Sequence, residues 1–335
     1  MQQRTIGPFT VSAIGLGCMS LSGQNYGPAP APEEGARVLH AALDSGVTLL
    51  DTAALYGFGG SEELMGRAIK GRRHEYTLAS KGGMAGVRGE DGVMRRVIDG
   101  RPEAIRRNCE DSLRRLQTDV IDLYYLHRWD KKVPVEDSVG AMSDLVRAGK
   151  VRELGLSEVS VATLRKAHAV HPIVAVQSEY SLWTRNPEIG MLDACREIGA
   201  AFVAFSPLAR QFLTGKLTDV SGFAKGDIRS PMPRFSPENH ARNLKLLPPY
   251  LSLAEEAGCT PAQLAIAWLL HKAPHIVPIP GTGNVAHLHD NLGADAVKLS
   301  PALLPRLESL INQSTVAGHR YADQARGEVD TEDFA

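Results

Sequence analysis

The chain has 335 residues, of which 43% are hydrophobic and 22% charged, as in an ordinary soluble globular protein with a sizeable core. Its formal net charge of −1 provides no broad basic field, which argues against nucleic acid or a membrane surface as partner. No apolar run approaches the ~18–20 residues of a membrane-spanning helix, and the start MQQRTIGPFT lacks the apolar region of a secretion signal, so we expect a cytoplasmic protein. The four cysteines are far apart without CxxC spacing, which indicates reduced thiols.

The chain up to residue 205 alternates between short strands and amphipathic helices. Residues 4–17 predict a β-hairpin around Gly7-Pro8 that leads into a strand at 13–16. Helices are then predicted at residues 32–45, from 61, and at 102–116, 136–148, 160–170 and 187–198. The intervening strands are predicted at residues 47–50, 75–80, 120–126, 151–156, 174–177 and 200–205. Residues 82–100 are Gly-rich and polar and predict a long loop.

The rest of the chain continues the pattern without a break in composition. Residues 207–240 form a long Gly-, Pro- and Ser-rich connection, and helices resume near Ala241 and Pro261. A last strand at 275–279 precedes a helix from Asn284, a further helix at 301–312 and a polar tail at 318–335. We therefore expect one domain over residues 1–335, a (β/α)8 TIM barrel with an N-terminal β-hairpin and extra C-terminal helices. An open doubly wound sheet is the structural alternative.

Chemically useful side chains follow the predicted strands. In a barrel of this type, function gathers at the carboxyl ends of the strands. These ends carry Asp51, Lys81, His127, Ser157 and Gln177, with Phe205-Ser206 and Gly281-Thr282 after later strands and Tyr56 on the loop after Asp51. Each residue alone has a structural explanation, such as a turn cap or a solvated lysine. Asp, Tyr, Lys and His at successive strand ends together indicate one converging active site.

The chemistry of these four types fits proton transfer to a carbonyl oxygen. A phenol, with an ordinary pKa of ~10, is a poor proton donor or acceptor near neutrality. Lys81 would stabilise the phenolate of Tyr56, and Asp51 would hold Lys81 charged. A neutral His127 would donate a hydrogen bond to the carbonyl oxygen. Hydride must then come from a cofactor, because no side chain supplies it.

From Arg4 to about Ala317 the chain resembles the aldo-keto reductase superfamily. The resemblance rests on DTAALYG at residues 51–57, LASKGG at 78–83 and LYYLHR at 123–128. GLSEVSVATLRKAHAVHP and QSEYSLWTR are most similar to the branch that contains perakine reductase and bacterial and yeast enzymes. The resemblance implies that Tyr56 is the general acid, that Lys81 and Asp51 tune it, and that His127 orients the substrate carbonyl.

The resemblance also implies a nicotinamide cofactor, bound extended and without a dinucleotide fold. Ser157 and Gln177 match the residues that hold its carboxamide, and Phe205 matches the aromatic that stacks on the ring, usually Tyr. The segment from Ser206, Pro207 and Leu208 to Lys216 matches the loop along the pyrophosphate. Two departures are Glu158, where most families have Asn, and Gln211, where Gly is common.

The segment Gly281-Thr282-Gly283-Asn284-Val285-Ala286 fits G-x-G-x-x-A. We reject a Rossmann fingerprint, because no second strand with an acidic ribose ligand follows. A Gly-rich turn at a helix N-terminus presents free N–H groups to phosphate, and in the family it holds the 2′-phosphate of NADP. A neighbouring Arg or Lys is missing here, which leaves His287 and Asn291 as ligands. We therefore expect NADP(H), with weakened discrimination against NAD(H).

The substrate pocket and the competing functions complete these predictions. Trp129 and Trp183 follow the fourth and sixth strands, where they would wall the pocket or pack on its rim, and Met19 is a further candidate.

The main hypothesis is an NADP(H)-dependent reductase of a small aldehyde or ketone, without a metal. A short-chain dehydrogenase needs Tyr-x-x-x-Lys, which no tyrosine here provides. A cofactor-binding, redox-sensing regulatory subunit on the same barrel is the alternative of a different class.

Overall fold

A closed parallel barrel forms the centre of the computed structural model, which describes residues 1–23 and 25–334. Eight strands pair in the order β12-β11-β10-β9-β8-β5-β4-β3. Their bounds are β3 (Leu16–Gly17), β4 (Leu49–Asp51), β5 (Thr77–Gly82), β8 (Ile121–Leu126), β9 (Val151–Ser157), β10 (Ile173–Glu179), β11 (Ala201–Phe205) and β12 (Ile276–Pro278). The end strands meet where Gly17 bridges Gly281 and where the Gly15 N–H donates to the Pro278 carbonyl at 3.0 Å. The predicted (β/α)8 barrel is confirmed, and the open doubly wound sheet is wrong.

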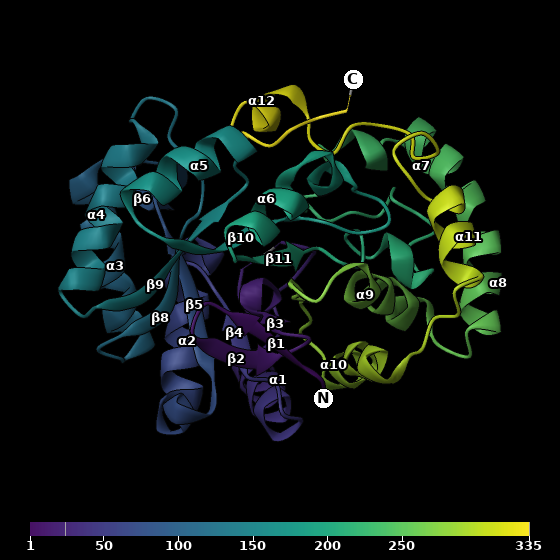
Figure 1. Cartoon of the computed structure of the whole chain (residues 1–335), viewed down its shortest axis with the longest axis horizontal. Helices are drawn as coiled ribbons and strands as arrows, with labels where there is room; N and C mark the ends of the chain where they lie inside the picture. Colours follow the sequence, from purple (N-terminus) through teal and green to yellow (C-terminus); the bar gives the residue numbers. More distant parts are fainter. Residues whose placement is uncertain (24, 335) are drawn as a thin grey trace.

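Helices surround the sheet in the expected alternation (Figure 1). The helices of the (β/α) repeat are α1 (Pro32–Asp44), α2 (Gly60–Ile69), α3 (Pro102–Leu116), α4 (Val135–Arg147), α5 (Val161–Val170), α6 (Met191–Glu197), α9 (Pro261–Lys272) and α10 (Val285–Leu292). The additional helices are α7 (Pro237–Asn243), α8 (Leu247–Glu256), α11 (Leu303–Leu310) and α12 (Asp323–Arg326). Helix α3 shows why these segments are helical. Its apolar residues recur at helical spacing and are buried against the sheet, namely Ile105, Cys109, Leu113 and Leu116. No helix in the described ranges is both long and apolar enough to cross a bilayer.

The barrel interior is a separate, smaller apolar cluster. It contains Leu49, Leu123 and Val203 from the strands, together with Ile6 and Val11 from the N-terminal hairpin. That hairpin pairs β1 (Gln3–Ile6) with β2 (Phe9–Ser12) in antiparallel register, as predicted. Because parallel strands expose their carboxyl ends at one rim, this packing leaves the strand-end side chains facing a single mouth.

The long polar loop predicted at residues 82–100 is an antiparallel hairpin instead. Strand β6 (Met84–Arg88) pairs with β7 (Met94–Ile98), and Met84 is opposite Ile98. The turn contains Asp91-Gly92, with Gly92 at φ +76°, a conformation that glycine adopts without strain. The alternation of apolar residues in these strands is weak because the hairpin is largely exposed, so the sequence showed no clear strand period.

The polar tail predicted from residue 318 is anchored to the barrel. The Asp330 carboxylate accepts hydrogen bonds from the Ser160 and Thr163 hydroxyls at 2.8 and 2.6 Å. Glu332 Oε1 accepts from the backbone N–H of Val161 at 2.7 Å. Both carboxylates therefore lie at the N-terminus of α5, where a helix favours negative charge. Figure 1 shows this segment in yellow, passing from α11 through α12 at the end of the molecule away from the N-terminus.

Candidate active site

A cavity of about 1660 Å³ opens at the carboxyl ends of the barrel strands. It is lined by most of the predicted site residues: Met19, Asp51, Tyr56, His127, Ser157, Gln177, Phe205, Ser206, Pro207, Leu208, Lys216, Gly281, Thr282, His287 and Asn291. Pockets for one small ligand measure about 300–1,000 Å³. This cavity therefore has room for an extended dinucleotide and a substrate together.

Lys81 lies beneath the cavity wall and links two of the predicted residues. Its Nζ donates to Asp51 Oδ1 at 2.5 Å, to the Thr52 carbonyl at 2.9 Å and to the Tyr56 hydroxyl at 3.3 Å. The ammonium and the carboxylate are both buried, whereas Tyr56 is only partly buried and lines the cavity. The structure thus brings Asp51, Lys81 and Tyr56 into one chain of contacts that ends at the cavity.

Burial and charge act on the Tyr56 phenol in opposite directions. Burial raises its pKa most, Lys81 lowers it, and the net result is a pKa above the usual value. For Lys81, burial lowers the pKa, but Asp51 and Tyr56 together raise it above the usual value. Tyr56 is therefore protonated and Lys81 charged at neutral pH. Lys81 acts on the phenol in the expected direction, but burial outweighs it.

His127 is a neutral neighbour of Tyr56. The two rings meet edge to face, with centroids 5.8 Å apart and an interplanar angle of 87°. Burial holds the His127 pKa well below its usual value, and Arg128 and Lys81 lower it further. Within the described part of the chain its Nδ1 is buried without a hydrogen-bond partner, so Nε2 is the ring nitrogen that a substrate can reach. A carbonyl oxygen can thus be placed between the phenol and this imidazole.

Two further predicted residues contact this group from neighbouring strands. Gln177, on β10, donates from Nε2 to Asp51 Oδ2 at 2.7 Å, so Asp51 is held from two sides. Ser157, the last residue of β9, accepts a hydrogen bond at its Oγ from Arg128 Nη1 at 3.2 Å. Among the described residues, no hydrogen bond engages the side-chain oxygen of Gln177 or the hydroxyl hydrogen of Ser157, so both can bind an amide ligand in the cavity.

The segment after β11 has a left-handed backbone and contains Gln211, one departure from the family pattern. Ser206, Ala209, Arg210 and Gln211 have φ values of 50°, 49°, 54° and 80°. Gln211 adopts a conformation that favours glycine, and its Oε1 accepts a hydrogen bond from Arg229 Nη1 at 2.7 Å. The side chain thus ties this turn to the long connection that follows it.

The opposite end of the cavity is formed by the turn before α10. Asn284 caps the helix, and its Oδ1 accepts from the His287 N–H at 3.1 Å. His287 is exposed and Asn291 is buried, and both line the cavity. A helix N-terminus that faces a cavity is a favourable place for phosphate.

The two tryptophans predicted as pocket walls lie elsewhere. Trp183 is only 2% exposed and stacks on Phe212 with centroids 4.2 Å apart. Trp129 is partly buried against the outer core, and its indole N–H donates to the Val133 carbonyl at 2.8 Å. Neither is among the described residues that line the cavity. Their large apolar rings are buried more favourably under the rim than exposed at the mouth, and Met19 is the candidate that does line the cavity.

Several cavity residues were not predicted from the sequence. They are Tyr26 and Arg128 from two loops, Arg96 from β7, Arg210 after β11, and Tyr321, Gln324 and Glu328 from the C-terminal tail. Arg128 follows His127 directly in LYYLHR, so its position was available as a signal. The tail residues gave no such signal, because polar segments without periodicity do not reveal what they pack against.

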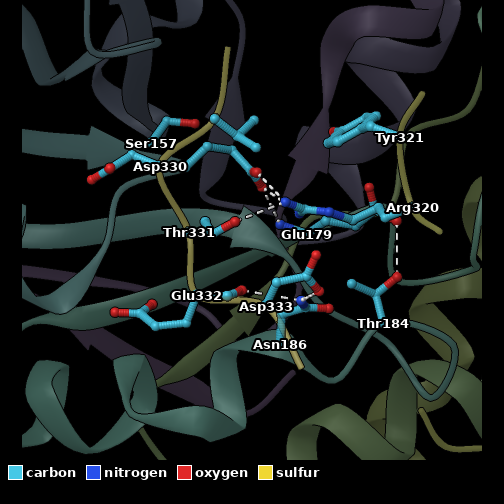
Figure 2. Close-up of polar contacts among 12 residues, drawn as sticks. Ser157, Glu179, Thr184, Asn186, Arg320, Tyr321, Asp330, Thr331, Glu332 and Asp333 are labelled. Carbon is cyan, nitrogen blue, oxygen red and sulfur yellow. Dashed lines mark hydrogen bonds and ion pairs between the residues drawn. The ribbon is translucent and has the colours of Figure 1, made fainter. Parts of the chain in front are cut away.

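Arg320 holds the start of the tail against the barrel. It donates from Nη1 and Nη2 to the two carboxylate oxygens of Glu158 at 2.9 and 2.7 Å, and it also bonds the Thr331 hydroxyl at 3.0 Å. Figure 2 shows Arg320 directed toward Thr331, and Asn186 toward Asp333. Glu158, the second departure from the family pattern, therefore serves as an anchor for the tail.

Comparison with known proteins agrees with this geometry. Residues 13–312 match the model of the aldo/keto reductase family. The aldo-keto reductase yakc [NADP(+)] of Schizosaccharomyces pombe is 42% identical over 331 residues, covering 97% of this chain and 96% of that protein. The chain belongs to the aldo/keto reductase family and is an oxidoreductase.

Solved structures show the same fold. The glycerol dehydrogenase AKR11B4 from Gluconobacter oxydans matches with a TM-score of 0.84 and 31% identity, covering 92% of this chain and 94% of that one. An aldo/keto reductase from Klebsiella pneumoniae, solved with NADP and acetate, matches with a TM-score of 0.68 and 29% identity, covering 93% and 95%.

Proposed function

We propose that this chain is an NADP(H)-dependent reductase that converts aldehydes or ketones to alcohols. The observation that carries the proposal is the Tyr56 hydroxyl at the cavity wall, 3.3 Å from the buried Lys81 ammonium that Asp51 holds in place. The NADP(+) in the name of the S. pombe relative and the NADP bound by the K. pneumoniae neighbour support this choice of cofactor.

The residues around the cavity divide the work of proton transfer. A bound nicotinamide would supply the hydride. His127, kept neutral by burial, donates a hydrogen bond from Nε2 and orients the carbonyl oxygen. Tyr56 gives its proton to that oxygen, and Lys81 stabilises the phenolate that remains. Asp51 keeps Lys81 charged and directed toward the phenol.

The cavity residues fit a dinucleotide along their length. Ser157 and Gln177 would hold the carboxamide, the ring of Phe205 would stack on the nicotinamide, and the segment from Ser206 to Lys216 would follow the pyrophosphate. Thr282, His287 and Asn291 would hold the adenosine end. Because the turn before α10 has no Arg or Lys of its own, we infer that NADP(H) is preferred but NAD(H) also binds.

Oxidation of NADPH in the presence of benzaldehyde tests the proposal. We expect the purified protein to consume NADPH only when the aldehyde is present and to release benzyl alcohol in equal amount. A protein that binds NADPH but turns over none of a broad panel of aldehydes and ketones would contradict the proposal. That result would favour the regulatory subunit.

A further inference from the structure

Arg128 is a cation at the catalytic end of the cavity that pairs with no carboxylate in the described part of the chain. Among the described residues, three arginines line the cavity. Arg96 pairs with Glu328 at 2.6 Å, and Arg210 pairs with Glu179 at 2.7 Å. Within residues 1–23 and 25–334, Arg128 forms no ion pair. The two carboxylates that line this part of the cavity, Asp51 and Glu328, are already engaged by Lys81 and Arg96.

The contacts of Arg128 fix its guanidinium in one orientation. Its Nη1 donates to the His127 carbonyl at 2.7 Å and to the Ser157 hydroxyl at 3.2 Å. These two bonds use both hydrogens of Nη1. Nε and Nη2, with three further N–H groups, have no hydrogen-bond partner among the described residues and are not sealed in the core. The open side of the guanidinium is thus the two-nitrogen edge that matches a planar carboxylate.

This edge lies close to the reacting groups. Arg128 follows His127 in the chain and bonds Ser157, the strand-end residue expected beside the nicotinamide. Its charge also lowers the pKa values of both His127 and Tyr56, as a neighbouring cation does. An anion held by Arg128 would therefore lie beside a carbonyl placed between Tyr56 and His127.

We propose that Arg128 binds a carboxylate of the substrate, so that the preferred substrates are aldehydes or ketones that carry a carboxylate near the carbonyl group. This inference rests on the proposed reductase function. It adds a substrate class and a specificity-determining residue, because the four proton-transfer residues recognise the carbonyl group alone. Arg96, which is exposed and already paired with Glu328, is the matched cation expected to contribute little.

Formylbenzoates and their methyl esters test Arg128, because each acid differs from its ester by one negative charge. The three positional isomers vary the distance between the aldehyde and the carboxylate, and each methyl ester keeps the ring and the aldehyde. The readout is the ratio of kcat/KM for each acid to that for its ester, in the wild type, Arg128→Met, Arg128→Lys and Arg96→Met. Dissociation constants of the same pairs in the presence of NADP+ give the comparison without turnover.

We expect the wild type to favour at least one acid over its ester by about 10- to 100-fold, the range for a hydrogen bond between charged groups. Arg128→Met should lose that ratio, Arg128→Lys should recover part of it, and Arg96→Met should keep it. Equal values for acid and ester in all three isomers, or a ratio that survives Arg128→Met, would overturn the proposal. Loss of the ratio in Arg96→Met alone would also overturn it. If no aldehyde is reduced, the reductase function fails, and the dissociation constants still decide the role of Arg128.

Discussion

Glu158 and Arg320 form a buried two-point ion pair that joins the end of β9 to the C-terminal tail. Their side chains are 0% and 9% exposed, and both carboxylate oxygens accept a hydrogen bond. Glu158 has a left-handed backbone, with φ +56°, directly after Ser157. The tail between Arg320 and Asp330 supplies Tyr321, Gln324 and Glu328 to the cavity wall. The pair therefore holds one wall of the cavity beside a residue expected to bind the cofactor.

Replacing Glu158 should release this wall. Glu158→Gln keeps the shape of the side chain but removes the carboxylate that pairs with the buried Arg320, and breaking a buried pair costs about 3–5 kcal/mol where the structure cannot relax. Detachment of the tail relieves much of that cost, so we expect rapid proteolytic cleavage after Arg320 or Arg326 and a raised KM, with a smaller fall in the free energy of unfolding. Limited proteolysis with trypsin and steady-state kinetics measure both effects.

Arg320→Gln is the matched control for Glu158→Gln. Because both variants break the same contact, the effects of the double variant on KM and on the cleavage rate should be smaller than the two single effects combined. Additive effects on KM and on the cleavage rate would show that Glu158 acts through something other than Arg320.

The phenol of Tyr56 should titrate at higher pH when Lys81 is removed. Burial already raises its pKa, and Lys81 is the main group that lowers it. Alcohol oxidation needs the phenolate and therefore gains activity as pH rises through this pKa, so in Lys81→Met the gain should occur at higher pH and with lower maximal turnover. The pH profile of benzyl alcohol oxidation with NADP+ measures it, and Lys81→Arg should restore part of the shift. An unchanged profile in Lys81→Met would exclude the coupling.

His127 should make the protein less stable in mild acid. Its pKa in the folded protein lies well below the ordinary ~6.5, chiefly because of burial, so the unfolded chain binds a proton that the folded chain does not. The free energy of unfolding therefore falls as pH decreases below about 6.5, by up to about 1.4 kcal/mol per pH unit for one histidine. Burial also lowers the pKa values of His171, His240 and His275, which add to the slope.

The comparison with His127→Gln isolates the contribution of this residue. Urea unfolding between about pH 5 and 7 should give a shallower dependence in the variant than in the wild type. Equal slopes would mean that His127 binds protons equally in the folded and unfolded states.

The preference for NADPH over NADH should depend on His287. This exposed side chain lines the cavity at the N-terminus of α10, where it can donate a hydrogen bond to a 2′-phosphate. His287→Ala should therefore bind NADPH more weakly and NADH about as well as the wild type. Dissociation constants of both cofactors in the two proteins measure the preference.

His289→Ala is the matched control. His289 is exposed on the same helix but is not among the described residues that line the cavity, so this variant should keep the wild-type preference. An unchanged preference in His287→Ala would remove His287 from phosphate binding.

The sequence predicted the barrel because its signals are local and repeated. Each strand is a short apolar run, each helix has an apolar face, and α3 begins and ends at the predicted Pro102 and Leu116. Asp51, Lys81 and His127 could be placed at one site because carboxyl ends of parallel strands share a rim. Predicted and observed boundaries differ at the first strand, expected at 13–16 and found at Leu16–Gly17, and at α6, expected at 187–198 and found at Met191–Glu197.

Long-range partners explain what the sequence did not reveal. The tail reads as polar and aperiodic, and its order depends on Glu158, Ser160 and Thr163, more than 150 residues earlier in the chain. Trp183 was placed at the mouth from its position after a strand, but Phe212 offers its ring a stacking surface in the core. Burial also sets the direction in which the Tyr56 pKa is shifted, and no spacing in the sequence shows how deeply a side chain is buried.

Turnover and cofactor binding of Tyr56→Phe test the central claim most directly. The variant loses only the hydroxyl that faces Lys81, so benzaldehyde reduction should fall below a tenth of the wild-type rate, a loss of more than about 1.4 kcal/mol. Its dissociation constant for NADPH should stay near the wild-type value, because the proposed cofactor contacts lie on other elements. Tyr26→Phe, which removes a different hydroxyl from the cavity wall, should retain most activity. If Tyr56→Phe kept more than a tenth of the wild-type turnover, Tyr56 would not be the proton donor.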